Sequence, residues 1–188
     1  MRSLPVNFIA WAHYFLAASV QVGETVLDCT VGNGNDTLFL ANLVGVRGKV
    51  IGFDIQEEAI KLTQIKLDAK GYNNVQLFCT GHENVCEYVK IPIAGAIFNL
   101  GYLPRGDHRI ITHGSTTIMA LKEIIKILRP GGIVAIVVYS GHPGGQEEGE
   151  SVGAFLAELP QFAFSITKLD FVNRINNTTY LLIVEKNI

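Results

Sequence analysis

Short apolar runs alternate with longer segments of mixed polarity along most of this 188-residue chain. The apolar runs are rich in β-branched residues, which is typical of strands that a parallel sheet buries on both faces. They predict strands over Thr25–Thr30, Lys49–Asp54, Val75–Cys79, Ala94–Leu100 and Ile133–Tyr139. The segments that follow the strands predict helices over Asp36–Val46, Glu57–Lys70, Asn84–Val89 and Thr116–Leu128. This alternation predicts an α/β fold with a doubly wound, Rossmann-like and mostly parallel sheet.

The pattern changes after the fifth strand. A helix is predicted over Glu147–Leu159, and two strands are predicted over Phe162–Asp170 and Thr178–Glu185. The turn residues Asn176 and Asn177 separate these strands without an intervening helix, which indicates a hairpin. We therefore expect seven strands, with the closing hairpin adding one antiparallel strand at the edge of the sheet.

The segment Phe8–Val20, within an N-terminal helix predicted over about residues 5–20, is apolar enough to resemble a signal peptide. Asn7 and His13 interrupt it, and the glycine motif described below follows at once. We therefore predict an amphipathic helix that covers the sheet. No run reaches the roughly 18 apolar residues of a membrane span. With 48% hydrophobic and 17% charged residues, the chain is expected to form a single domain over residues 1–188.

Charge and cysteine content narrow the class of protein. The net charge of -2 gives no basic footprint, so a nucleic-acid partner requires a local group of basic residues. Cys29, Cys79 and Cys86 are odd in number and form no Cys-x-x-Cys pair, which argues against a disulfide framework and against a zinc site. We interpret them as reduced, mostly buried thiols of a cytoplasmic protein, and we predict no metal.

A glycine turn follows the first predicted strand. The strand ends at Asp28, Gly32 and Gly34 come next, and a helix begins near Asp36. This arrangement lets a nucleotide-like ligand lie against bare backbone at a helix N-terminus. Thr37 stands where a dinucleotide fingerprint has its third glycine, and this weakens an NAD interpretation.

Further polar groups follow the first three strands. Asp54 lies about 20 residues after the glycines, where a carboxylate accepts both ribose hydroxyls of an adenosine. Gln56 is expected in the same pocket, Gly81 gives room for the adenine, and the backbone or ring of His82 contacts it. Asp28 either orients the loop or faces the cofactor's amino-acid part, which the amides of Asn33 and Asn35 bind. The predicted cofactor site comprises Asp28, Gly32, Asn33, Gly34, Asn35, Asp36, Thr37, Asp54, Gln56, Gly81, His82 and Asn99.

Asn99 ends the fourth strand and is followed by Leu-Gly-Tyr-Leu-Pro. The segment resembles the Asn-Pro-Pro-Tyr type motif of amino-group methyltransferases. The Asn99 carbonyl is suited to accept N–H bonds from an amine and to aim its lone pair, while Tyr102 is suited to stack on a planar base. A dehydrogenase has no need for this set.

Four motifs together resemble one bacterial family: Asp-x-Thr-x-Gly-Asn-Gly-x-Asp-Thr at 28–37, Phe-Asn-Leu-Gly-Tyr-Leu-Pro at 98–104, Gly-Asp-His at 106–108 and Tyr-Ser-Gly-His-Pro-Gly-Gly at 139–145. The family was formerly labelled putative rRNA methylase. Its members are tRNA 5-aminomethyl-2-thiouridine methyltransferases of the MnmM type. The resemblance implies a class I methyltransferase fold and S-adenosylmethionine as cofactor. The implied reaction methylates the aminomethyl nitrogen of the wobble uridine in the tRNA anticodon loop, giving 5-methylaminomethyl-2-thiouridine.

The loops after strands four and five contain the remaining candidates. Asp107, His108 and His142 are candidates to receive or relay the proton that an alkylamine must lose before attack. Alternatively, Asp107 caps a turn and His142 binds phosphate or backbone. Arg105 stands where the family pattern has a small residue; it either adds a phosphate contact or tightens the loop differently. The predicted catalytic residues are thus Asn99, Tyr102, Asp107 and His142.

A local group of basic residues lies near this predicted site. It comprises Arg105, His108, Arg109 and His113, and Lys122, Lys126 and Arg129 would extend it; the alternative is a solvated helix face. We predict that the substrate is bound by Tyr102, Arg105, His108 and Arg109. Glu147 and Glu148 are expected to charge the N-terminal turn of the following helix, where anions are favoured.

Other functions remain open at this point. The first is a methyltransferase that acts on a small-molecule amine or on rRNA. The second is an NAD-dependent oxidoreductase, and the third is a cofactor-binding protein without catalysis. Exposed apolar faces of the N-terminal helix or the final hairpin would support a homodimer.

Overall fold

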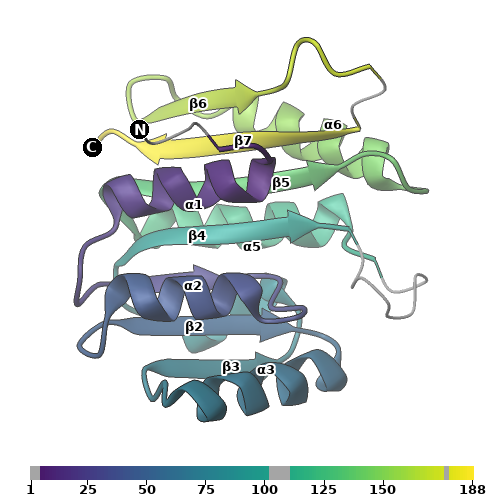
Figure 1. The fold of residues 1–188 in the computed structure, drawn as a ribbon. Coiled ribbons are helices and arrows are strands. Elements are labelled where there is room, and N and C mark those ends of the chain that lie inside the picture. The colour runs from purple at the N-terminus through teal and green to yellow at the C-terminus, as the bar shows by residue number, and fades with distance from the viewer. Residues whose placement is uncertain (1–4, 102–110, 176–177) are drawn as a thin grey trace.

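The computed structural model describes residues 5–101, 111–175 and 178–188. Within these residues the strands form one seven-stranded sheet in the order β3-β2-β1-β4-β5-β7-β6 (Figure 1). The strands are β1 Thr25–Asp28, β2 Lys49–Asp54, β3 Val75–Cys79, β4 Ile93–Leu100, β5 Leu128–Tyr139, β6 Phe164–Leu169 and β7 Thr179–Lys186. The helices are α1 Phe8–Ser19, α2 Asn35–Val44, α3 Glu57–Lys70, the 3-10 turn η1 His82–Asn84, α4 Val85–Tyr88, α5 Gly114–Ile127 and α6 Gly145–Ala157.

The sheet has the predicted class of fold but a different order at its end. Strands β1 to β5 pair in parallel, β7 runs antiparallel to β5, and β6 runs antiparallel to β7. The mostly parallel sheet with a C-terminal hairpin is therefore confirmed. The expectation that the antiparallel strand lies at the edge is wrong, because β7 lies between β5 and β6. The run Leu181–Val184 in β7 is buried, whereas most side chains of β6 are exposed, so the more apolar strand takes the inner position.

Helices cover both faces of the sheet. Helices α1, α2 and α3 lie in front of it in Figure 1, and α5 and α6 lie behind. On the front face, Phe8, Ala12 and Leu16 of α1 are buried in a cluster with Leu40 of α2. The predicted N-terminal helix that covers the sheet is thus confirmed. Asn7 caps this helix, since its Oδ1 accepts a hydrogen bond of 2.8 Å from the backbone N–H of Ala10.

Strand β5 begins earlier than its predicted start at Ile133. Helix α5 ends at Ile127, and the strand pairs already at Leu128, opposite Ile93. The register then shifts before Ile133 pairs with Gly95, so the segment Arg129–Gly132 forms a bulge. A bulge tolerates Pro130, which has no N–H to donate to a ladder.

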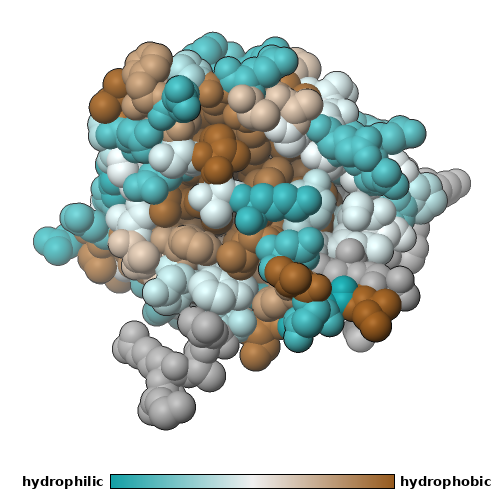
Figure 2. All heavy atoms as spheres, turned by 90° about the horizontal axis from the view of Figure 1, so that it is seen from above, coloured by the Kyte–Doolittle hydropathy of each residue, from teal (hydrophilic) through white to brown (hydrophobic). Residues whose placement is uncertain are grey.

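The exposure of the cysteines contradicts one prediction, and the predicted homodimer is not tested by the structure. Cys29 is buried, but Cys79 and Cys86 are exposed, so the prediction of mostly buried thiols is wrong. Among the described residues no helix is both long and apolar enough to cross a membrane. Figure 2 looks onto the β6 end of the sheet, where apolar surface gathers near the centre and polar side chains border it. Ile166 of β6 is exposed there, and the homodimer stays a prediction.

Candidate active site

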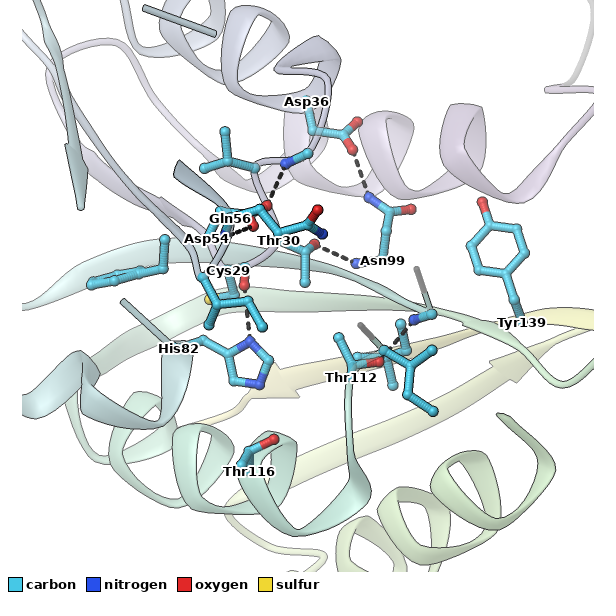
Figure 3. Close-up of a pocket in the computed structure, with 18 of the residues that line it drawn as sticks. Cys29, Thr30, Asp36, Asp54, Gln56, His82, Asn99, Thr112, Thr116 and Tyr139 are labelled. Carbon is cyan, nitrogen blue, oxygen red and sulfur yellow. Dashed lines mark hydrogen bonds between the residues drawn. The ribbon is translucent and has the colours of Figure 1, made fainter. Parts of the chain in front are cut away.

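A cavity of about 660 Å³ opens where the parallel strands end (Figure 3). The loops after β1 to β5 line it, and Ile9 of α1 and Thr116 of α5 contribute to its walls. The volume suits a ligand of nucleoside size, since small-molecule sites span roughly 300–1,000 Å³. The position agrees with the rule that open α/β sheets bind ligands at the carboxyl ends of their strands.

The glycine turn after β1 forms the wall of the cavity at the start of α2. Gly34 occupies the N-cap of α2 in a left-handed conformation with φ 75°. A Cβ atom at this position would lie 2.5 Å from Thr63 Oγ1, so α3 leaves room for glycine alone. The turn therefore brings bare backbone and a helix N-terminus to the cavity, as its sequence predicts.

Asp54 is held in place by backbone groups. Its Oδ2 accepts from the Gly32 N–H over 2.8 Å, and its Oδ1 accepts from the Gln56 N–H over 2.9 Å. Burial raises the pKa of this carboxyl, and the two backbone hydrogen bonds oppose that rise. Asp54 lines the cavity, and a carboxylate oxygen can accept more than one hydrogen bond. This arrangement fits a ligand with two neighbouring hydroxyls.

His82 forms part of the cavity wall near the end of β3. Its Nδ1 lies 3.0 Å from the Cys29 carbonyl, and because a carbonyl only accepts, Nδ1 is the donor. Burial lowers the pKa of the ring, which favours the neutral form. Nε2 is then an acceptor, and this buried atom has no hydrogen-bond partner among the described residues. The predicted contact between His82 and a base stays a prediction.

Most of the predicted cofactor residues line this cavity. They are Gly32, Asn33, Asn35, Asp36, Asp54, Gln56, Gly81, His82 and Asn99. Asp28, Gly34 and Thr37 are not part of the described lining. Thr37 Oγ1 donates to Asp28 Oδ2 over 2.6 Å, and the Thr30 N–H donates to Asp28 Oδ1 over 3.2 Å. Of the two roles considered for Asp28, this geometry favours orienting the loop.

Asp28 is an unusual carboxyl because it is fully buried. Burial, with the nearby charge of Asp36 as the next cause, raises its pKa to about 7. Its hydrogen bonds from the Thr30 N–H and from Thr37 Oγ1 hold the segment that follows β1.

Asn99 is fixed at the end of β4 by both its backbone and its side chain (Figure 3). Its N–H donates to Thr30 Oγ1 over 2.8 Å, and its Nδ2 donates to Asp36 Oδ2 over 2.6 Å. Its Oδ1 is buried and has no hydrogen-bond partner among the described residues. An amide acceptor without a partner in a cavity wall is costly unless a ligand supplies a donor.

Sequence reasoning missed two residues that surround Asn99. His13 of α1 lies 2.5 Å through its Nε2 from Asp36 Oδ1, although the sequence marked it only as an interruption of an apolar segment. Tyr139 ends β5 and lines the cavity, and burial together with the charge of Asp36 raises its pKa. No local pattern reveals such partners, because His13 and Asp36 lie 23 positions apart.

The loop after β4 is closed at its base. The Thr112 N–H donates to the Gly101 carbonyl over 2.9 Å, and the Gly101 N–H donates to Thr112 Oγ1 over 2.8 Å. Thr112 Oγ1 in turn donates to Glu148 Oε2, and Thr117 Oγ1 donates to Glu148 Oε1. Glu147 and Glu148 occupy the first turn of α6 as predicted, but the buried Glu148 also joins α5 to this loop.

The candidates on the loop itself, Tyr102, Arg105, Asp107, His108 and Arg109, lie outside the described residues, so their roles stay predictions. His142 lines the cavity, and its Nδ1 lies 3.0 Å from the Pro143 carbonyl. His113 also lines the cavity and precedes the first residue of α5.

The proposed extension of the basic group toward Arg129 is wrong. Arg129 lies near the start of β5, at the end of the parallel strands opposite the cavity. There it donates to both Glu24 carboxylate oxygens over 2.6 and 2.9 Å. Lys126 pairs with Glu123 over 2.7 Å near the distal end of α5. Helix α5 begins at the cavity and has 14 residues, so it ends roughly 20 Å away.

A family model described as "Putative rRNA methylase" matches residues 50–185. A protein of Arabidopsis thaliana named "tRNA (mnm(5)s(2)U34)-methyltransferase, chloroplastic" is 42% identical over 174 residues, which is 87% of this chain and 64% of that protein. The chain thus spans slightly less than two thirds of the length of this relative.

Solved structures share the fold over nearly the whole chain. A putative rRNA-methylase from Clostridium thermocellum superposes with a TM-score of 0.95 at 43% identity, covering 98% of this chain and 100% of that one. A putative methyltransferase from Streptococcus mutans, crystallised in complex with SAH, has a TM-score of 0.89 at 40% identity and covers 97% and 99%.

Proposed function

The chain belongs to the Putative rRNA methylase family, and from this premise we propose that it transfers a methyl group from S-adenosylmethionine to an amine of tRNA. The resemblance that the sequence motifs indicate is confirmed by this membership. The proposed acceptor is the nitrogen of the 5-aminomethyl group on a 2-thiouridine at the wobble position, and the product is 5-methylaminomethyl-2-thiouridine. The name of the Arabidopsis relative, a methyltransferase of U34 in tRNA, supports this substrate.

The observation that carries the proposal is that the buried Oδ1 of Asn99 has no hydrogen-bond partner among the described residues. An amine nucleophile brings N–H donors, whereas a carbon or phenolate nucleophile does not. Because Nδ2 is occupied by Asp36, the free end of the amide is the acceptor end. A hydrogen bond from the amine N–H to this acceptor would orient the nitrogen lone pair, which favours methyl transfer to nitrogen.

The described residues fit the cofactor. Asp54 would accept the ribose hydroxyls, the His82 wall and Gly81 would border the adenine, and the glycine turn with Asn33 and Asn35 would hold the amino-acid end. The bound cofactor supplies a methyl group that its sulfonium charge already activates. SAH in the Streptococcus mutans relative, which has the same fold, supports this choice.

The chain must also hold the amine in its neutral form, because an alkylamine is mostly protonated near neutral pH. We propose His142, which lines the cavity, as one acceptor of that proton. An RNA partner fits the chain despite its net charge of -2, because a wobble base lies in a single-stranded loop that needs no duplex opening. The cytoplasmic location stays a prediction.

Mass spectrometry of wobble nucleosides tests the proposal. The full chain is incubated with S-adenosylmethionine and with tRNA from cells that lack the final methylation, and the digested tRNA is then analysed. We expect 5-aminomethyl-2-thiouridine to decrease and its N-methylated product to increase by the same amount.

The alternatives are arms of the same experiment. Labelled methyl transfer to rRNA or to a panel of small amines, with none to tRNA, would contradict the proposed substrate. A calorimetric titration with NAD and with S-adenosylmethionine distinguishes an oxidoreductase from a methyltransferase. Binding of S-adenosylmethionine without methyl transfer to any acceptor would indicate a cofactor-binding protein without catalysis.

A further inference from the structure

The hydrogen bonds of Asp36 connect the N-terminal helix to the amide at the cavity wall. His13 Nε2 lies 2.5 Å from Asp36 Oδ1, and Asn99 Nδ2 donates to Asp36 Oδ2 over 2.6 Å. We propose that His13 and Asp36 are positioning residues, which together hold the Asn99 amide with its oxygen free for the substrate amine. The inference rests on the methyl-transfer function proposed above.

The carboxylate decides which way the amide faces. An asparagine side chain has two orientations that exchange its oxygen and its nitrogen and have nearly the same shape. With the oxygen turned toward Asp36, two acceptors would face each other at 2.6 Å and repel. With the nitrogen there, one N–H is satisfied and Oδ1 is left as the acceptor. Asp36 therefore selects the orientation that binds an amine.

His13 is needed because a carboxylate alone is poorly fixed. The final torsion of an aspartate side chain is broad, so one hydrogen bond does not define the plane of the carboxylate. His13 takes the second oxygen, and Asp36 is 8% exposed, so little water is available to replace the histidine. Without His13, the Asp36 carboxylate would be free to turn, and the amide of Asn99 would turn with it.

The imidazole is itself held by two elements. Its ring stacks on Phe39 of α2 with centroids 3.8 Å apart and planes 4° from parallel. Phe8, Ala12 and Leu16 bury the inner side of α1 against the sheet, so the backbone of His13 is fixed by the core. Helix α1 thus has a role beyond covering apolar surface. His13 lies before residues 50–185, which the family model matches, so that match gives no indication of it.

A matched pair of substitutions tests the role of the hydrogen bond. His13→Phe keeps a flat ring against Phe39 and removes the donor, whereas His13→Gln places an amide N–H near the position of Nε2. We expect His13→Phe to lower kcat for tRNA methylation by about 10- to 100-fold, because small misplacements of reacting groups have effects of this size. The Kd for S-adenosylmethionine and the KM for tRNA should stay within about threefold. His13→Gln should retain kcat within about threefold, and so should the control Tyr14→Ala, at the exposed neighbouring position.

A second measurement, NMR of the Asn99 side-chain amide, reports the hydrogen bond to Asp36 without requiring catalysis. The side-chain ¹⁵N–¹H signals of Asn99 are assigned by their loss in Asn99→Ala. In the wild type and in His13→Gln, one proton should be shifted downfield by its bond to the carboxylate, and in His13→Phe this shift should shrink. Unchanged Asn99 signals in His13→Phe would overturn the inference, and so would equal losses of kcat in the Phe and Gln variants. A wild-type enzyme that methylates no tRNA would refute the proposed function instead, while the signals would still decide the role of His13.

Discussion

The two halves of the cavity are built by different kinds of contact. On the side of β1, β2 and β3, the cavity-lining side chains of Asp54 and His82 are fixed by backbone groups: Asp54 by the N–H of Gly32 and of Gln56, and His82 by the Cys29 carbonyl. On the side of β4 and β5, side chains fix one another. Asp36 joins Asn99 to His13, and Glu148 joins two threonines. The first half can be recognised from motifs, and the second depends on residues far apart in the chain.

The largest expected effect comes from breaking the side-chain half at Asn99. Asn99→Ala removes the acceptor for the amine and should lower kcat by about 100- to 1,000-fold, the range seen when a preorganised transition-state hydrogen bond is lost. The Kd for S-adenosylmethionine, measured by calorimetry, should change by less than about threefold. Normal turnover in this variant would refute the role of Asn99.

Breaking the backbone-held half should give the opposite pattern. Asp54→Asn places an amide group between two N–H donors and should weaken cofactor binding by about 30- to 100-fold, or about 2–3 kcal/mol. At saturating cofactor, kcat should recover. Glu57→Gln is the control, because Glu57 is an exposed carboxylate on the first turn of α3 that pairs with Lys61. If both variants bind the cofactor like the wild type, Asp54 has no ribose role.

Stability should also depend on the side-chain half. Glu148→Ala leaves the hydroxyls of Thr112 and Thr117 without their buried partner and should lower the free energy of unfolding by about 2–3 kcal/mol. Urea denaturation followed by circular dichroism measures this. The neighbouring exposed Glu147→Ala should change stability by less than about 0.5 kcal/mol. Similar losses in both variants would mean that only the charge at the start of α6 matters.

The buried Asp28, at the end of β1 beside the first half of the cavity, should make the stability of the fold depend on pH. Its pKa is about 7 in the folded chain and near 3.8 when unfolded, so the folded state binds the extra proton between these values. Its contribution to stability is complete below pH 3.8 and is lost as the pH rises through 7. Relative to Asp28→Asn, the wild type should therefore lose about 2–3 kcal/mol of stability between pH 5 and pH 8 in urea denaturation. A constant difference would mean that Asp28 is ionised throughout.

The smallest effect on stability is expected at Arg129, which lies at the end of the parallel strands opposite the cavity. Arg129→Ala breaks the partly exposed pair with Glu24 and should lower stability by about 0.5–1 kcal/mol. Its KM for tRNA should equal that of the wild type, because the residue lies at the wrong end of β5. A KM for tRNA that is raised in Arg129→Ala and falls back at low salt would mean that RNA binds near Arg129. That result would contradict RNA binding at the cavity end of the sheet.

The comparison also explains how far the sequence alone could predict the molecule. The bounds of β2, α3 and β3 agree with the prediction at every residue, since Asp54 ends β2 and glycines, Gly71 and Gly81, follow α3 and β3. The position of β7 could not be predicted, because period and polarity show a strand but not its neighbours. Likewise, the glycine turn and Asp54 can be identified from their spacing in the sequence. His13 and Glu148 cannot, because their hydrogen-bond partners are brought near them only by the fold.

The insertion of β7 between β5 and β6 has a consequence for how the chain is made. On the ribosome β6 emerges before the strand that must join it to the sheet, so its ladder forms last. Until then β5 presents an unpaired edge containing the apolar run Val134–Val138, a surface prone to aggregation. A product of early translation termination that lacks β7 would carry most of the cavity residues and still be a target for chaperones and proteases.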